Sequence, residues 1–137
     1  MLPHNHFLIA GLIIAPVALA AFPEKSIIDI GEWVMVGGLL SSVIDLDIVT
    51  LVLIRSRKER RLKPFMNPLE IYRNFELFMD TITETGVLMT GLKTHLIFST
   101  LVILVFYLVL NVYFIPVALG VASHILCDIP NVRRLIH

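Results

Sequence analysis

Charged side chains are scarce in this chain of 137 residues: Asp, Glu, Lys and Arg together make up 16%, whereas hydrophobic residues make up 57%. An average soluble domain carries about 25% charged residues. A soluble domain of this small size exposes much of its area and could not hide so much apolar surface. The composition therefore predicts one membrane-embedded domain over residues 1–137, with membrane lipids around it.

Cysteine and net charge are also nearly absent. Cys127 is the only cysteine, and eleven basic residues balance eleven acidic ones. One cysteine excludes an intrachain disulfide framework and a cysteine-based zinc cluster. The balanced charge argues against nucleic acid as the main partner, because binding to phosphates depends on an excess of Lys and Arg.

Basic residues are missing ahead of the first apolar run, residues 7–22, where a secretory signal peptide carries them. We therefore expect this run to remain in the protein as a helix. Cleavage is the alternative, since the run ends in Val-Ala-Leu-Ala-Ala, which resembles a signal-peptidase site. Cleavage would remove His6 from any functional site.

Long apolar runs are present, and they indicate transmembrane helices, which need about 20 residues to cross about 30 Å of hydrocarbon. Residues 96–127 contain no Asp, Glu, Lys or Arg and are too many for one straight span. Asn111 and Pro116 indicate a turn within this run. We predict an all-α integral membrane bundle with four transmembrane helices, at about residues 6–22, 31–54, 92–111 and 115–129.

Residues 68–84 predict a further, amphipathic helix. Asn67 is a suitable cap, Pro68 suits the first helical position and Glu70 the third. Apolar residues recur at helical spacing from Leu69 to Ile82. We expect this helix to lie at the membrane interface or against the bundle.

The basic residues predict the orientation of the chain. Six of the eleven Lys and Arg residues lie within residues 55–63, and short loops rich in Lys and Arg stay cytoplasmic. With this loop inside, the N- and C-termini are also cytoplasmic. We therefore expect a multi-pass protein of the plasma (inner) membrane.

Six ionisable residues stand out because they fall within the predicted spans. An Asp at the middle of a spanning helix costs about 2.5–3.5 kcal/mol on insertion scales, so such residues are usually functional or paired. Each lies near the predicted cytoplasmic end of its helix, so we expect them to meet at one metal site. The six residues are His6, Asp45, Asp47, His95, His124 and Asp128.

Spacing indicates how these side chains point. His124 and Asp128 are four residues apart and share a helix face, which suits chelation of one ion, although an interfacial hydrogen-bonded pair is the simpler alternative. Asp45 and Asp47 would point about 200° apart on a regular helix. Either the helix is broken near Ser41, or one carboxylate binds and the other supports it. Imidazole with carboxylate suits zinc, manganese or iron(II).

The motifs resemble those of the small inner-membrane proteins known as membrane-bound metal-dependent hydrolases. That family has an early His, a Pro-Asp-x-Asp-His motif, a His-Arg-Gly-x-Thr-His motif and a Gly-x-x-Ser-His-x-x-x-Asp motif. The matching segments here are His6, Asp45-Leu-Asp47, Thr94-His95 and Gly120-Val-Ala-Ser-His124-Ile-Leu-Cys-Asp128.

The resemblance implies that His6, Asp45, His95, His124 and Asp128 bind a metal. It implies that Asp47 is a second ligand, an orienting group or the general base. The sequence also departs from the family pattern, and so lacks at least one expected ligand and one cation. The departures include Ile44, Ile48, Thr90 and Gly91. Asp80 and Glu84 are candidate substitutes, although nothing in the sequence requires this role of them.

Two classes of function follow from these residues. The first is a metal-dependent hydrolase that acts on a small amphiphilic or phosphoester substrate at the cytoplasmic face, since the site lies at membrane depth. The alternative is a non-catalytic multi-pass protein that binds metal structurally, passes ions or serves as a subunit of a complex. An ion path through so few spans would require a homo-oligomer.

Overall fold

The computed structural model describes residues 3–133 and 135, and within them the chain is helical with no β-strand, as predicted. Seven α-helices are joined by short connections and two 3-10 helices, η1 and η2. In chain order the elements are α1 (Pro3–Ala21), α2 (Ile27–Val43), α3 (Leu46–Arg55), η1 (Arg60–Met66), α4 (Pro68–Arg73), α5 (Phe75–Glu84), α6 (Val87–Leu108), η2 (Asn111–Tyr113) and α7 (Phe114–Arg133).

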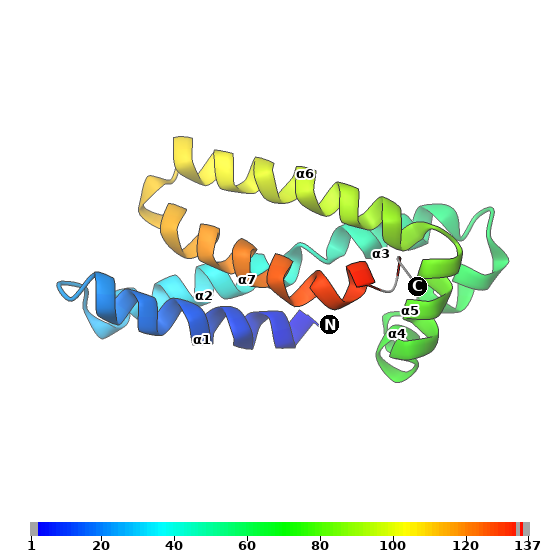
Figure 1. Cartoon of the computed structure of the whole chain (residues 1–137), viewed down its shortest axis with the longest axis horizontal. Coiled ribbons are helices and arrows are strands. Elements are labelled where there is room, and N and C mark those ends of the chain that lie inside the picture. The colour runs from blue at the N-terminus through cyan, green and yellow to red at the C-terminus, as the bar shows by residue number, and fades with distance from the viewer. Residues whose placement is uncertain (1–2, 134, 136–137) are drawn as a thin grey trace.

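Four helical stretches are long and apolar enough to cross a membrane: α1, α2 continued by α3, α6, and α7 with η2. They run lengthwise beside one another, while α4 and α5 lie at one end of the bundle (Figure 1). The start of α1 and the end of α7 lie towards that same end, although the first two and last two residues are outside the described part of the chain. The architecture supports the predicted multi-pass membrane bundle.

The second predicted span, residues 31–54, differs from the structure at both its start and its middle. Helix α2 begins earlier, at Ile27, because Ser26 and Asp29 form a capping box in which each side chain accepts a hydrogen bond from the other's backbone N–H. The helix then breaks at Ile44 and Asp45, and not at Ser41. Ile44 is buried in the bundle at the break, so the packing holds the turn in place.

The predicted amphipathic helix over residues 68–84 is also two helices, because Asn74 leaves the helical conformation at φ −123° and ψ 47°. Helix α5 packs against the end of the bundle. Its apolar side chains join a core with residues of α3 and α6, and the shared core includes Val52, Phe78, Met79, Ile82 and Leu88.

The basic loop is folded against this same end. Arg55 donates to the Thr85 carbonyl at 3.2 Å, and Arg61 pairs with Glu84 at 2.9 Å. The backbone N–H and the guanidinium of Arg61 also hold the pKa of Glu59 below its usual value. These contacts tie the loop to α5 and to the start of α6, which begins at Val87 and therefore earlier than residue 92.

Helices α2 and α7 cross at two glycines. A Cβ atom built on Gly120 would lie 2.3 Å from the Gly37 carbonyl oxygen, and one built on Gly37 would lie 2.4 Å from the Pro116 carbonyl oxygen. Only glycine allows backbones to approach this closely in a membrane bundle. The crossing therefore sets the distance between α2, which leads into Asp45, and α7, which carries His124.

The long apolar run is interrupted as predicted, over residues 109–113, where η2 turns the chain back. Pro116 lies in the first turn of α7, where backbone N–H groups have no partner within the helix, so the missing N–H of proline costs no helical hydrogen bond. The Tyr113 hydroxyl donates to the Glu32 carboxylate and ties this turn to α2. Because the chain reverses here, His95 and His124 return to the same end of the bundle.

Candidate functional site

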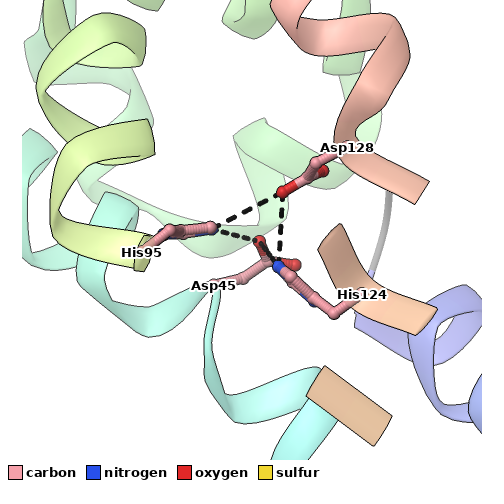
Figure 2. Close-up of side chains that lie close together, drawn as sticks. All are labelled: Asp45, His95, His124 and Asp128. Atoms are coloured by element: carbon pink, nitrogen blue, oxygen red, sulfur yellow. Dashed lines mark hydrogen bonds and ion pairs between the residues drawn. The ribbon is translucent and has the colours of Figure 1, made fainter. Parts of the chain in front are cut away.

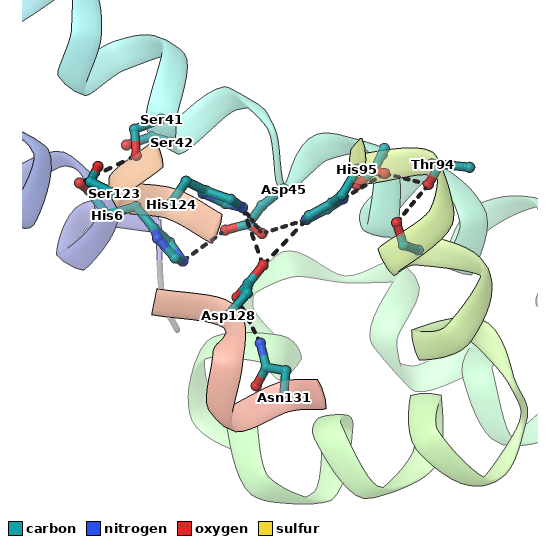
Figure 3. Close-up of polar contacts among 12 residues, drawn as sticks. His6, Ser41, Ser42, Asp45, Thr94, His95, Ser123, His124, Asp128 and Asn131 are labelled. Carbon is teal, nitrogen blue, oxygen red and sulfur yellow. Dashed lines mark hydrogen bonds and ion pairs between the residues drawn. The ribbon is translucent and has the colours of Figure 1, made fainter. Parts of the chain in front are cut away.

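Five side chains from four parts of the helical bundle converge on one buried point. His6 comes from the start of α1, Asp45 from the break between α2 and α3, and His95 from α6. His124 and Asp128 lie on successive turns of α7. Figure 3 shows these five side chains directed towards one another. All are buried except Asp45, which is partly exposed. The residues singled out in the sequence are thus brought together.

Four of these residues form a tight cluster, which we call the His/Asp cluster: Asp45, His95, His124 and Asp128 (Figure 2). One potential ligand atom from each lies within 4.8 Å of those of the other three. The Asp45 Oδ1 atom is 3.4 Å from His95 Nε2 and 3.7 Å from His124 Nε2. The Asp128 Oδ2 atom is 3.7 Å and 3.3 Å from the same two nitrogens.

These separations suit a shared ion better than direct hydrogen bonds. Good N–H···O hydrogen bonds have donor–acceptor distances of about 2.7–3.2 Å. Tetrahedral ligands with bonds of about 2.0–2.2 Å lie about 3.3–3.6 Å from one another. The four N···O distances of 3.3–3.7 Å are close to this second range, and all six separations between the ligand atoms are within 4.8 Å. The His/Asp cluster therefore has the spacing of a site that could hold one divalent metal ion.

Buried polar atoms that lack a hydrogen-bond partner support the same fit. Both ring nitrogens of His6 and of His124, together with Asp45 Oδ2, are buried without a hydrogen-bond partner among the described residues. More than about 90% of buried polar groups in proteins have such a partner. An ion bound by the four cluster residues would give one of these atoms, His124 Nε2, a direct partner.

His6 lies beside the cluster and is not one of its four members. Its Nε2 atom is 3.4 Å from Asp45 Oδ2, the carboxylate oxygen that does not face His95. Its ring centroid lies 4.2 Å from that of His124. His6 therefore contacts two members of the cluster, Asp45 and His124, from the α1 side.

Asp47 lies on the opposite side of the His95 ring from the cluster. His95 Nδ1 donates to Asp47 Oδ2 at 2.7 Å, and the Thr94 hydroxyl donates to the same oxygen at 2.5 Å. A carboxylate that accepts from one ring nitrogen fixes the ring so that the other nitrogen faces the ligand site. Among the three roles predicted for Asp47, this contact favours the orienting one.

One supporting residue was not identified from the sequence. The Asn131 side-chain amide donates to Asp128 Oδ1 at 2.7 Å, which leaves Asp128 Oδ2 to face the two histidines. Asn131 lies three residues after Asp128 on the same face of α7. This spacing was the only signal for it in the sequence.

The acidic residues considered as substitutes do not reach the cluster. Asp80 and Glu84 line a separate surface cavity with Glu76 and Thr83, and Glu84 pairs with Arg61. Thr90 and Gly91 stand where the hydrolase motif has His-Arg. Arg55 of α3 instead donates to the Thr90 hydroxyl at 2.9 Å, so its charge lies at the start of α6.

An apolar cavity opens from the cluster between α6 and α7, and we call it the α6–α7 cleft. Its volume is about 320 Å³. His95 and Asp128 contribute the two polar groups at its inner end, where the cluster lies. The cleft gives the His/Asp cluster an opening on the side of the bundle.

Comparison of the chain with protein-family models, with curated proteins and with solved structures gives no match. The likeness to metal-dependent hydrolases therefore depends on the short motifs in the sequence. What the site can do must be argued from its own geometry.

Proposed function

We propose that this protein is a membrane-embedded, metal-dependent hydrolase that acts on an amphiphilic or phosphoester substrate. The observation that carries the proposal is the His/Asp cluster, whose four potential ligand atoms lie within 4.8 Å of one another at membrane depth. Zinc, manganese and iron(II) are the candidate ions, since each accepts imidazole nitrogen together with carboxylate oxygen.

Charge balance supports a bound cation. Asp45 and Asp128 bring two carboxylates to within reach of one point, and buried charges are strongly unfavourable unless they are paired or bind a metal. One divalent ion neutralises both carboxylates. The neutral imidazoles of His95 and His124 complete the ligand set without adding charge.

The bound ion would polarise the scissile bond and lower the pKa of a water molecule towards about 7. His95, His124, Asp45 and Asp128 hold it, while Asp47 acts through the His95 ring and Asn131 through Asp128. Asp47 is thus a positioning residue in this proposal, and not a group that touches the substrate.

The α6–α7 cleft favours catalysis over purely structural metal binding. Structural metal sites are closed, whereas catalytic sites keep a position open for water or substrate. Here the cleft reaches two of the four ligands. Four protein ligands alone would fill a tetrahedral zinc site. Catalysis would therefore require an ion that accepts water or substrate as a further ligand, as zinc does when it expands to five-coordination and as manganese or iron(II) does with higher coordination numbers.

The orientation belongs to the same proposal. The basic loop, residues 55–63, folds at the end of the bundle where α1 starts and α7 ends. By the preference of Lys and Arg for the cytoplasmic side, this end faces the cytoplasm of a plasma (inner) membrane. The His/Asp cluster would then lie in the cytoplasmic half of the bilayer.

Turnover tests the hydrolase directly. The purified chain is supplied in detergent with zinc, manganese or iron(II) and with dodecyl para-nitrophenyl phosphate, and release of nitrophenol is followed. We expect release that requires the metal and falls to background in Asp128→Asn. Stoichiometric metal without turnover of this or related long-chain esters would support the alternative, a structural metal site.

Asp47→Asn tests the positioning role. Asparagine can still accept a hydrogen bond from His95 Nδ1 but loses the negative charge that strengthens it, and such supporting contacts contribute about 10- to 100-fold to metal affinity. We expect a loss in this range with the stoichiometry unchanged, measured by titration with a metal-sensitive dye. Glu24→Gln, which alters an exposed loop carboxylate, is the matched control. A complete loss of metal in Asp47→Asn would instead make Asp47 a direct ligand.

A further inference from the structure

The α6–α7 cleft indicates what kind of molecule reaches the cluster. We infer that it holds the alkyl chain of an anionic, single-chain amphiphile, with the head group at His95 and Asp128 and the chain directed towards lipid. This inference rests on the proposed function, and it names the substrate class and the route by which the substrate arrives.

The lining of the cleft has the character of an alkyl-chain site. Along its length it presents only apolar side chains apart from the two cluster residues and one lysine. Ligand cavities of this kind, with apolar walls and few polar groups, have volumes of about 300–1,000 Å³. The value of about 320 Å³ is at the lower end, which suits one chain better than two. The apolar walls are Met89, Leu92, Leu96, Ile125 and Val132.

The cleft lies open to the surroundings of the bundle. Leu96 is 58% exposed on the α6 side and Ile125 is 40% exposed on the α7 side. Both lie within helices that are long and apolar enough to span a membrane. In a bilayer this opening faces lipid tails, so an amphiphile can enter sideways without its chain leaving the apolar phase.

Lys93 supplies the charge that selects an anionic head group. It lines the cleft one helical turn after Met89 and close to Leu96 on the same face of α6. Its side chain is exposed, and a Lys near a helix end can extend its ammonium towards the head-group region. An anionic phosphate or carboxylate head group in the cleft is therefore complementary in charge to Lys93.

A second apolar cavity offers another possible route to His95. It has a volume of about 380 Å³ and lies between α6 and the α2–α3 segments, lined by Val43, Leu46, Phe98 and the polar pair Asp47 and Thr94. This cavity reaches the side of His95 that Asp47 already occupies. Of these two cavities, the α6–α7 cleft is the one lined by members of the His/Asp cluster, His95 and Asp128.

Photolabelling tests the inference without relying on turnover. The full chain in phosphatidylcholine nanodiscs is illuminated with a dodecyl phosphate that carries a diazirine on its chain, and labelled residues are identified by mass spectrometry. We expect labels on Leu96, Ile125 or Val132. Excess unlabelled dodecyl phosphate should remove them, whereas inorganic phosphate should not, because it has no chain to occupy the cleft.

Two leucines provide a matched pair of variants. Leu96→Trp fills the α6–α7 cleft, whereas Leu46→Trp fills the second cavity, and the two leucines are 58% and 56% exposed. We expect labelling to be lost only in Leu96→Trp. Equal labelling of both variants, loss in Leu46→Trp, or labels on Phe98 would overturn the assignment of the route.

Charge reversal at Lys93 tests the head group separately. Lys93→Glu should lower labelling by dodecyl phosphate about fivefold, the effect of about 1 kcal/mol at an exposed ion pair, and should not lower labelling by a dodecyltrimethylammonium probe. An equal effect on both probes would exclude selection for anions. If the protein binds no metal, the proposed function is overturned, but labelling of the cleft can still be measured. If the protein binds metal and the cleft is not labelled, only the present inference is overturned.

Discussion

Replacing His124 with alanine is expected to lower the affinity of the protein for its divalent metal by about a hundredfold to a thousandfold. Four-ligand zinc sites bind with about 10–16 kcal/mol, so one ligand in four accounts for about 2.5–4 kcal/mol, and about 1.4 kcal/mol corresponds to a factor of ten. His124 is fully buried and its Nε2 atom lies within 3.7 Å of both cluster carboxylates. Its loss should therefore leave the cluster with one imidazole for two carboxylates, of which Asp128 is buried and Asp45 is partly exposed.

Metal analysis of detergent-purified protein measures this effect, with about one ion per chain expected in the wild-type protein. His4→Ala is the matched control, because His4 is exposed and contacts only the Tyr72 ring among the described contacts. It should retain the metal. Wild-type protein that binds no zinc, manganese or iron(II) would contradict the metal site and the hydrolase together.

Gly120→Ala is expected to cause the largest loss of stability, about 3 kcal/mol in the free energy of unfolding, at the upper end of the cost of overpacking. The added methyl group would lie 2.3 Å from the Gly37 carbonyl oxygen. A backbone atom cannot move away by changing rotamer, so α2 and α7 must separate. Thermal unfolding followed by circular dichroism in detergent measures the change.

The matched control is Gly31→Ala in α2, where an added Cβ has no neighbour within 4 Å. It should stabilise the helix by up to about 1 kcal/mol, because alanine is the better helix former. Gly120→Ala should also weaken metal binding, since α2 leads into Asp45 and Gly120 lies one turn before His124. Equal stability of the two variants would exclude close contact between α2 and α7.

The membrane class and most of the cluster residues could be predicted from the sequence, because burial of charge in lipid is costly wherever it occurs. His6, His95 and His124 stand out in apolar runs without any knowledge of their neighbours. The i, i+4 spacing of His124 and Asp128 likewise depends only on helix geometry. Such local rules do not depend on the packing of distant segments.

The division of roles between Asp45 and Asp47 was decided by tertiary structure. Helical periodicity would point them about 200° apart, and the break at Ile44 and Asp45 determines where each one points. That break is held by packing of Ile44 against Val117 and Val121 of α7. Contacts with a distant helix therefore set the position of Asp45 Oδ1 relative to the cluster.

By itself the sequence determined an all-helical chain with four apolar spans. It also identified a few ionisable side chains whose exposure to lipid would be energetically unfavourable. The folded arrangement decided which of these side chains meet, which one supports His95 from behind, and which side of the bundle is open. The physical reason is that hydropathy and helix spacing are properties of neighbouring residues. Convergence of α1, α3, α6 and α7 depends on the close α2–α7 crossing and on the turn at residues 109–113.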